Sequence, residues 1–541
     1  MTDSSELNVG EATIALLEKY GVDTLFGIPG VHTLDFCKGL NRSSIRHVQA
    51  RNEQGAGFMA DGYARASGKP GVALVISGPG VTNTLTAIGQ AYADSIPVLM
   101  LSADAASYTL GKGWGCLHEV PGLTDTTAPL TAFSATAMTA EEVPGLIAKA
   151  FSVFASERPR PVHIAIPIDV LAMPATGDWQ AIELPTRPAP TARKIERACE
   201  LLRAAEQPMI CVGGGAWMAS EAITEIAQRL GAAVIGSTAG KGVIDDSHPL
   251  SLSAGTVRGE VQRYLKNADV VLALGTELSE VDSFVETLEI NGKIIRVDLD
   301  PRKMNDLYPA EVAIIGGAKA SAEAIARNLG DVDVRSETVA EVAAIREDIR
   351  NNLSASEVRH CKTLDVLRSV LPPDTIVMGD ICQLVYTGAF AFDVPKPKLW
   401  HYPAGYCTLG CGLPDAIGAS LALPDAPVVS FVGDGGFMFT VQELVTAAEL
   451  KLALPIILWN NDGLKQIQDD MKLRNIELVG VSGINPDFIA LAKSCHCHAR
   501  KVDSAQDLRD AVNAAFTADR PTLIEVNEFA SWLSQAIVDG K

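Results

Sequence analysis

The sequence predicts an α/β protein of three doubly wound domains, each with a parallel sheet. Short runs of β-branched and other apolar residues alternate with longer helical patterns almost from end to end, which is typical of parallel strands covered by helices on both faces. This alternation restarts twice along the 541 residues, and 47% of the residues are hydrophobic. The chain is therefore long and apolar enough to bury three separate cores.

Each unit has its own expected elements. In the first unit we expect strands at 72–77 and 98–102 and helices at 53–66 and 82–92. The second unit has expected strands at 209–212, 270–274 and 294–297, and the third at 375–378, 428–432, 456–459 and 522–526. A proline-rich segment at 185–190 and a charged helical stretch at 337–356 separate the units. The predicted domains are N-terminal (1–187), central (188–355) and C-terminal (356–541).

The charge balance excludes some classes of partner. Lys and Arg number 45 against 65 Asp and Glu, a formal net charge of −20, and such a surface repels phosphate backbones, so no nucleic-acid partner is expected. No apolar run approaches the roughly 18 residues of a membrane span, and the N-terminus is polar and acidic. We therefore expect a cytoplasmic protein without a membrane partner. Its ten cysteines include no CxxC pair and are expected to be reduced thiols.

Polar clusters follow two neighbouring strands of the third unit. Gly433-Asp-Gly-Gly436 comes after the strand at 428–432, and Asn460-Asn-Asp-Gly463 comes after the strand at 456–459. Open α/β sheets bind ligands at the carboxyl ends of their strands. Glycines let backbone N–H groups approach phosphate oxygens, and carboxylate and amide oxygens are ligands that suit Mg²⁺. The two clusters together predict a metal and diphosphate site, although either one alone is equally explained as a turn.

The spacing of these clusters resembles the bipartite signature of thiamine-diphosphate enzymes. Twenty-four residues (436–459) separate the Gly-Asp-Gly from the Asn-Asn. The resemblance implies that Mg²⁺ is bound by Asp434, Asn461 and the carbonyl group of Gly463. It implies that the cofactor's diphosphate lies against Gly433, Gly435, Gly436 and Gln383.

The N-terminal unit resembles the pyrimidine-binding domain of the acetolactate synthase branch of the same superfamily. The motifs that carry this resemblance are Arg51-Asn-Glu53-Gln-Gly-Ala-Gly57, Gly62-Tyr-Ala-Arg-Ala-Ser-Gly-Lys-Pro-Gly71 and Ser77-Gly-Pro-Gly-Val-Thr-Asn83. The resemblance implies that Glu53 hydrogen-bonds the aminopyrimidine ring and so helps to form the reactive C2 carbanion. It places the apolar side chain of Leu409 beneath the bent cofactor. Taken alone, Glu53 would be read by default as a solvated residue at a helix start, and Leu409 as a core residue.

The same resemblance implies that a second copy of the chain completes the site. In this family the pyrimidine-binding domain of one subunit faces the diphosphate-binding domain of another. Glu53 and Asp434 are therefore expected to meet across an interface. A homodimer is the expected minimum, and a homotetramer is the usual form in the family.

Several positions depart from the acetolactate synthases. His118 occupies the place of a glutamine, and His32 that of a small residue near the reacting carbon, so both are candidate catalytic acids or bases. An ordinary loop histidine and a histidine at a helix start explain them equally well. Asp470 replaces a tryptophan that selects the acceptor, and an acidic pocket suits a cationic substrate. Val31 and Ile467 are further expected substrate contacts, and Asp380 and Asp415 are less direct candidates for the acidic partner.

These departures favour a decarboxylase that releases an aldehyde. The Leu117-His-Glu119 and Asn-Asn-Asp-Gly segments resemble those of 5-guanidino-2-oxopentanoate (2-ketoarginine) decarboxylases. The expected activity is that of a lyase: non-oxidative decarboxylation of a 2-oxo acid, with thiamine diphosphate and Mg²⁺ as cofactors and a guanidino-bearing 2-oxo acid as the candidate substrate. One alternative is a carboligase that joins the decarboxylated 2-oxo acid to a second carbonyl compound. Another is an oxidase with FAD at the glycine triplet Gly213-Gly-Gly215.

One further motif suggests a metal site. Cys495-His-Cys-His498 contains four potential ligands. Side chains on a strand alternate between its two faces, so these four cannot easily converge on one tetrahedral ion. We therefore expect an ordinary strand at 495–498.

Overall fold

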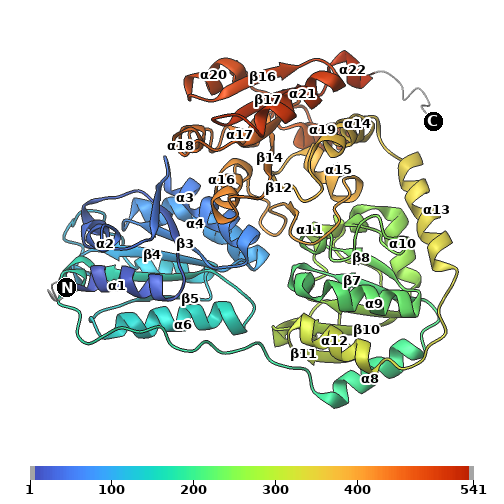
Figure 1. The fold of residues 1–541 in the computed structure, drawn as a ribbon, viewed down its shortest axis with the longest axis horizontal. Coiled ribbons are helices and arrows are strands. Elements are labelled where there is room, and N and C mark those ends of the chain that lie inside the picture. Colours follow the sequence, from blue (N-terminus) through green and yellow to red (C-terminus); the bar gives the residue numbers. More distant parts are fainter. Residues whose placement is uncertain (1–6, 535–541) are drawn as a thin grey trace.

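A computed structural model describes residues 7–534 of the chain as three α/β units, each with a parallel sheet. Figure 1 shows the N-terminal unit in blue and cyan, the central unit in green and yellow, and the C-terminal unit in orange and red. The predicted fold class is confirmed. All ten cysteines are free thiols, as expected. Within residues 7–534, none of the helices combines the length and the apolar character that a membrane-spanning segment requires.

The N-terminal sheet has the strand order β2-β1-β3-β4-β6-β5. Its strands are β1 (Thr24–Gly27), β2 (Arg46–Gln49), β3 (Gly71–Val75), β4 (Val98–Asp104), β5 (Phe133–Thr136) and β6 (Val162–Pro167). Apolar side chains on one face pack against α1 (Val9–Lys19), α2 (Leu34–Leu40) and α6 (Glu142–Ser156). Those on the other face pack against α3 (Glu53–Ser67) and α4 (Pro79–Asp94). The sheet is thus covered on both faces, as the continuous apolar strands require.

The central sheet has the order β11-β10-β9-β7-β8. Its strands are β7 (Pro208–Val212), β8 (Ala233–Gly236), β9 (Val270–Leu274), β10 (Lys293–Asp298) and β11 (Val312–Ile315). One face packs against α8 (Ala192–Arg203), α9 (Ser220–Leu230) and α12 (Ala318–Asn328). The opposite face packs against α10 (Gly259–Asn267) and α13 (Thr338–Asn351).

The C-terminal sheet has the order β13-β12-β14-β15-β17-β16. Its strands are β12 (Ile376–Gly379), β13 (Trp400–His401), β14 (Val428–Gly433), β15 (Pro455–Asn460), β16 (His498–Val502) and β17 (Thr522–Asn527). Its helices are α14 (Ala355–Val370), α15 (Gln383–Ala391), α16 (Gly412–Ala422), α17 (Asp434–Phe437), α18 (Glu443–Glu449), α19 (Lys465–Leu473), α20 (Phe488–Ser494), α21 (Ala505–Ala515) and α22 (Ser531–Ser534).

The expected strand at 495–498 is wrong for its first three residues. Cys495 caps the C-terminus of α20, and His496 has a positive φ of 64°. β16 begins only at His498, because a left-handed residue ends the helix with a turn. Between residues 7 and 534, no group of three or more His, Cys, Asp or Glu side chains is arranged to hold a metal ion.

In each sheet, the connections that leave one central pair of neighbouring strands run in opposite directions. The reversal falls between β1 and β3 in the N-terminal sheet, between β7 and β9 in the central sheet, and between β12 and β14 in the C-terminal sheet. Ligands of doubly wound folds bind in the crevice at this reversal, beyond the carboxyl ends of the strands. Functional side chains are therefore expected in the loops that follow these six strands.

The N-terminal and C-terminal units are joined by the packing of α3 against α16, which lie side by side in Figure 1. The helix backbones approach so closely that only glycine fits at the contact. A Cβ on Gly62 would lie 2.2 Å from the Asp415 carbonyl oxygen, and one on Gly418 would lie 2.0 Å from the Met59 carbonyl oxygen. The relative position of the two units thus depends on these two glycines.

A buried charge cluster lies at this helix contact. Arg65 donates from Nε to Asp61 Oδ2 at 2.7 Å and from Nη2 to Asp94 Oδ2 at 2.8 Å. Asp415 on α16 is buried beside them. Burial raises the pKa of Asp61 to about 6, and burial together with the Asp61 charge raises the pKa of Asp415 well above its ordinary value. With one guanidinium facing three acids, burial and the neighbouring Asp61 favour the protonated form of Asp415 in the folded protein.

We expect Asp415→Asn to change how stability depends on pH. Because the pKa of Asp415 is raised in the folded state, the protonated acid contributes to the free energy of unfolding at low pH. This contribution is lost as the pH rises, by at most about 1.4 kcal/mol per pH unit. Asparagine resembles the protonated acid and does not titrate. The variant should therefore gain stability relative to the wild type as the pH increases from 5 to 8, measured by urea unfolding of the cofactor-free protein.

Asp425→Asn is the matched control, because Asp425 is an exposed acid just beyond α16. It should follow the wild-type pH dependence. Parallel stability profiles for the wild type and Asp415→Asn would show that Asp415 is ionised in the folded state.

Candidate active site

Three oxygen atoms converge at the carboxyl ends of β14 and β15. The side-chain oxygen of Asn461 lies 3.1 Å from the Gly463 carbonyl oxygen and 3.2 Å from Asp434 Oδ1. Oxygens bound to Mg²⁺ lie at about 2.0–2.1 Å from the ion, so neighbouring ligands are about 3 Å apart. With the Asn461 amide turned over, its N–H groups would instead donate to the other two oxygens. Donor type and spacing therefore fit a Mg²⁺ ion held by one carboxylate, one amide and one carbonyl group.

The Asp434 carboxylate is held from one side. Asp434 is the first residue of α17 and is buried. Its Oδ2 accepts hydrogen bonds from the backbone N–H of Gly463 at 2.9 Å and from Asn485 Nδ2 at 2.7 Å. Burial raises the pKa of Asp434, and these hydrogen bonds act in the opposite direction. Since Oδ2 is engaged, Oδ1 is the oxygen that faces Asn461.

The other expected cofactor contacts surround this point. Gly433 ends β14, and Gly435 and Gly436 form the first turn of α17 next to Asp434. Gln383 begins α15, after β12, and thus lies across the strand reversal from Asp434. Its Nε2 donates to Gln466 Oε1 on α19 at 3.1 Å, while its buried Oε1 has no hydrogen-bond partner among the described residues. A ligand at this reversal would meet an amide that still has a free end.

Leu409 lies half-buried in the loop between β13 and α16. The N-terminal unit holds this loop: Gly405 N donates to Asp94 Oδ1 at 2.7 Å and Thr408 N donates to Gln90 Oε1 at 3.3 Å. On the other side, Gly410 N donates to Asp380 Oδ2 at 3.0 Å. The position of Leu409 therefore depends on hydrogen bonds to both units.

Two acids that the sequence offered as substrate partners have other roles. Asp380 is fully buried and accepts backbone hydrogen bonds from Ile381, Gly410 and Gly412. Asp415 is buried in the cluster between α3 and α16. Neither carboxylate is open to a ligand, so the interpretation of Asp380 and Asp415 as candidate substrate acids is wrong. Nor are they the solvated surface acids that are common in so acidic a chain.

A second group of side chains lies at the strand reversal of the N-terminal sheet. His32 follows β1 in a 3₁₀ turn (Val31–Thr33), and its Nδ1 shares a hydrogen bond with Ser77 Oγ at 2.8 Å. His118 lies opposite, with the two imidazole ring centres 5.4 Å apart. Burial and the neighbouring His118 lower the pKa of His32, so its imidazole is neutral at pH 7. Val31 is exposed beside this pair.

Glu53 is the first residue of α3 and is half-buried. Its Oε2 accepts a hydrogen bond from Asn83 Nδ2 at 3.0 Å, within the same unit. Arg51, its neighbour in sequence, pairs instead with Glu449 of the C-terminal unit. Glu53 is thus held by Asn83 of the Ser77–Asn83 motif and is not paired with Arg51.

The remaining expected substrate contacts lie on α19. Ile467 is exposed there, and Asp470 is half-buried, with Gln466 Nε2 at 3.4 Å from its Oδ1. No hydrogen bond or ion pair within residues 7–534 joins the candidate residues of the N-terminal unit to those of the C-terminal unit. One chain therefore presents two partial sites.

The glycine triplet at 213–215 is used inside the central unit. Gly213 N donates to the Leu274 carbonyl oxygen at 3.0 Å and Gly215 N donates to the Gly275 carbonyl oxygen at 3.2 Å. A Cβ on Gly213 would lie 2.1 Å from the Gly275 oxygen, so the triplet allows two backbones to pack. The cavity beside it measures about 20 Å³, room for a water molecule or two.

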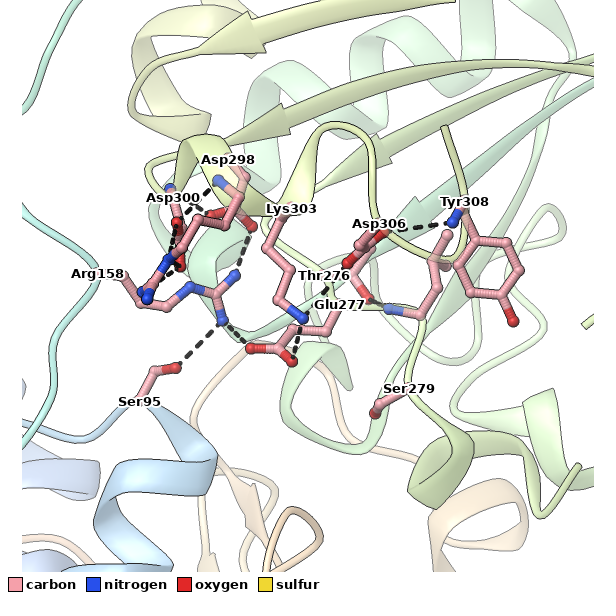
Figure 2. Close-up of polar contacts among 12 residues, drawn as sticks. Ser95, Arg158, Thr276, Glu277, Ser279, Asp298, Asp300, Lys303, Asp306 and Tyr308 are labelled. Carbon is pink, nitrogen blue, oxygen red and sulfur yellow. Dashed lines mark hydrogen bonds and ion pairs between the residues drawn. The ribbon is translucent and has the colours of Figure 1, made fainter. Parts of the chain in front are cut away.

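The chain's own cations pair with the acids at this edge of the central sheet. Figure 2 shows Arg158, which enters from the N-terminal unit, with Nη2 at 2.7 Å from Asp298 Oδ2 and Nη1 paired with Glu277. Lys303 Nζ lies 3.1 Å from Glu277 Oε2 and 3.4 Å from Asp306 Oδ2. With two of the three triplet amides engaged, the cavity small and the acids paired, this edge does not fit a bound dinucleotide such as FAD.

Comparison with known proteins identifies relatives along the whole chain. Three domain models of thiamine pyrophosphate enzymes match: the N-terminal TPP binding domain at 7–127, the central domain at 195–325 and the C-terminal TPP binding domain at 380–526. A probable 2-ketoarginine decarboxylase of Pseudomonas aeruginosa is 48% identical over 97% of this chain and 95% of its own length. The acetolactate synthase isozyme 2 large subunit of Escherichia coli is 30% identical over 96% of this chain and 95% of its own length. A probable acetolactate synthase large subunit of Methanococcus aeolicus is 30% identical over 96% of this chain and 92% of its own length.

We expect Asp434→Asn to abolish the rise in thermal unfolding temperature that Mg²⁺ and thiamine diphosphate together produce. The substitution removes the only carboxylate of the oxygen cluster, and Mg²⁺ binds neutral amide oxygens more weakly than carboxylates. Differential scanning fluorimetry with and without the two ligands measures this rise.

Asp462→Asn provides the control. Asp462 lies in the same turn but is exposed and has a left-handed backbone, with a φ of 60°, that asparagine tolerates. It should keep the full rise. An unchanged rise in Asp434→Asn would place the cation elsewhere.

Proposed function

The chain belongs to the thiamine pyrophosphate enzyme family, and on this premise we propose that it is a Mg²⁺-dependent 2-oxo acid decarboxylase that releases an aldehyde and CO₂. The observation that carries the proposal is the convergence of the Asp434, Asn461 and Gly463 oxygens, because one carboxylate and two neutral oxygens suit a metal shared with a diphosphate. The 48% identity to a probable 2-ketoarginine decarboxylase supports the reaction type.

Thiamine diphosphate, when bound, would supply a nucleophilic carbon for the 2-oxo group and a cationic ring that takes up the electrons left by departing CO₂. In the proposed enzyme, Asp434, Asn461 and Gly463 hold the Mg²⁺ ion. Gly433, Gly435, Gly436 and Gln383 would contact the diphosphate, and Leu409 would pack against the cofactor.

In the proposed enzyme, Glu53, His32 and His118 of the N-terminal unit bind or transfer protons. The Glu53 carboxyl group binds the pyrimidine ring nitrogen, and its hydrogen bond from Asn83 orients it. His32 has Nδ1 engaged by Ser77, which leaves Nε2 for proton exchange. His118 donates a proton to the substrate-derived carbon after CO₂ leaves, so the product departs as an aldehyde.

A second copy of the chain completes the proposed site. Large apolar side chains are exposed beside both partial sites: Tyr108, Trp114 and Leu117 in the N-terminal unit, and Leu473, Val479 and Ile484 in the C-terminal unit. Soluble monomers rarely leave such clusters in water. We therefore propose a homodimer in which Glu53 of one copy lies near Asp434 of the other, and a homotetramer as the usual family assembly. The ten free cysteines support a cytoplasmic location.

The proposed substrate is a 2-oxo acid with a guanidino group. The name of the 48% identical relative supports this class, and Asp470 on α19, with Ile467 one turn before it, offers a carboxylate to a guanidinium. Val31 would contact the substrate from the N-terminal unit. Acetolactate synthase activity remains the alternative, supported by relatives at 30% identity. An oxidase with FAD has less support, because the central unit does not fit the dinucleotide.

We expect the purified enzyme with thiamine diphosphate and Mg²⁺ to release CO₂ faster from 5-guanidino-2-oxopentanoate than from pyruvate, branched or aromatic 2-oxo acids. The product should be one aldehyde per CO₂, measured by an aldehyde dehydrogenase assay and mass spectrometry. A 2-hydroxy ketone or an acetohydroxy acid as the main product would establish the carboligase instead. Asp470→Asn should reduce the preference for the guanidino substrate, because the carboxylate charge that favours a cation is lost.

Mixing two inactive variants tests whether the site is shared between copies. We expect Glu53→Gln and Asp434→Asn to be inactive separately but active when co-expressed with different affinity tags. A mixed dimer would contain one intact site and one doubly altered site, so random pairing should restore about a quarter of the wild-type activity. Purification through both tags isolates the mixed dimer. An inactive mixed dimer would show that both residues serve one site within a single chain.

A further inference from the structure

A long segment without regular structure connects α19 to α20 and lies against the proposed metal site. It covers residues 474–487. The Val481 carbonyl oxygen accepts hydrogen bonds from Leu464 N at 3.1 Å and from Gln468 Nε2 at 3.0 Å. Near its other end, Asn485 reaches the Asp434 carboxylate. The segment is thus attached to the metal-binding turn at two points.

Asn485 makes contacts that a surface asparagine would not need. Its Nδ2 donates to Asp434 Oδ2 at 2.7 Å and lies 3.2 Å from Asn460 Oδ1. Asn460 in turn donates from Nδ2 to Glu525 Oε1 at 2.9 Å, and Lys501 Nζ lies 3.3 Å from the same oxygen. An ion pair followed by a row of hydrogen bonds therefore runs from the edge strand β16 to Asp434, and Asn485 is its last donor.

We propose that Asn485 is a positioning residue of the metal site, and that it couples Mg²⁺ binding to the conformation of segment 474–487. By holding Oδ2, Asn485 keeps Asp434 Oδ1 turned toward the Asn461 and Gly463 oxygens. The coupling is reciprocal. Mg²⁺ binding stabilises the docked conformation of segment 474–487, and docking of the segment increases the affinity for Mg²⁺. This inference rests on the proposed function, because the cation site is part of it.

The coupling has two measurable consequences. Removing a residue that orients a metal ligand lowers metal affinity about 10- to 100-fold. In addition, Lys472 and Arg474 are exposed trypsin sites where α19 ends and the segment begins. Mg²⁺ with thiamine diphosphate should slow cleavage at these two sites in the wild type, and this protection should be lost without the Asn485 side chain.

The variants are Asn485→Ala and Asn485→Asp, with Asn475→Asp as the matched control. Alanine removes the donor, and aspartate replaces it with a second negative charge beside Asp434. Asn475 belongs to the same segment but is exposed, and its left-handed backbone, with a φ of 56°, accepts aspartate. Mg²⁺ affinity is measured by calorimetry with saturating thiamine diphosphate, trypsin cleavage by mass spectrometry, and folding of the cofactor-free proteins by urea unfolding.

We expect both Asn485 variants to keep the wild-type urea midpoint, to bind Mg²⁺ about 10- to 100-fold more weakly and to lose the ligand-dependent protection. Excess Mg²⁺ should restore their turnover. Wild-type Mg²⁺ affinity and protection in both variants, or equal losses in Asn475→Asp, would overturn the role of Asn485 alone. A wild-type enzyme that binds no Mg²⁺ with thiamine diphosphate would overturn the proposed function as well.

Discussion

The backbone contact between α3 and α16 determines what one chain can and cannot assemble. Gly62 and Gly418 let the two helices meet without side chains between them, so neither helix can turn or slide without a clash. Glu53 begins α3, and its direction is therefore set by the same contact. The contact joins the two units, but the candidate residues at the strand reversal of one unit do not meet those of the other. This geometry is the physical reason to look for a second copy of the chain.

The buried acids of this protein illustrate two ways of keeping a carboxyl group away from water. Asp380 accepts three backbone hydrogen bonds, which compensate for much of the lost hydration. Asp415 has one side-chain oxygen without a partner among the described residues, and burial raises its pKa well above the ordinary value, which favours the uncharged acid. Removing a cation from such a cluster is costly, whereas the cluster itself adds little net stability. A wrong register of α3 on α16 would leave Arg65 or the acids unpaired, so the cluster favours the observed register.

The fold was predictable because the evidence for it is local. The strand expected at 270–274 coincides with β9, since a short apolar run in a doubly wound protein has one favourable structure. The turn at Cys495 was not predictable in this way, because it depends on how a helix ends. Burial of Asp380 and Asp415 was missed for a different reason. In an acidic chain, a carboxylate is expected to be exposed to solvent. Its burial can be predicted only when the residues that cover it are known, and these are distant in the sequence.

The candidate site shows the same limit. Asp434 and Asn461 could be selected from a spaced motif, but Asn485 lies 51 residues beyond Asp434 in a segment without periodicity. The sequence offered one indication of where Asn485 lies. It comes two residues before Asp487, which caps the N-terminus of α20, and a helix that packs on the sheet places this end of the segment near the sheet edge. That still could not identify its partner.

The central unit shows why a glycine motif does not establish a ligand. A glycine-rich turn after a strand binds phosphate when its N–H groups point into open space. Here Gly213 and Gly215 donate to the carbonyl groups of Leu274, which ends β9, and of Gly275, so the missing side chains allow close packing of two backbones. The acids beyond β9 and β10 then need cations, and Arg158 supplies one from the N-terminal unit (Figure 2). These ion pairs link the N-terminal and central units at this edge of the central sheet. The glycine triplet and the acids near it are thus accounted for by contacts within the chain.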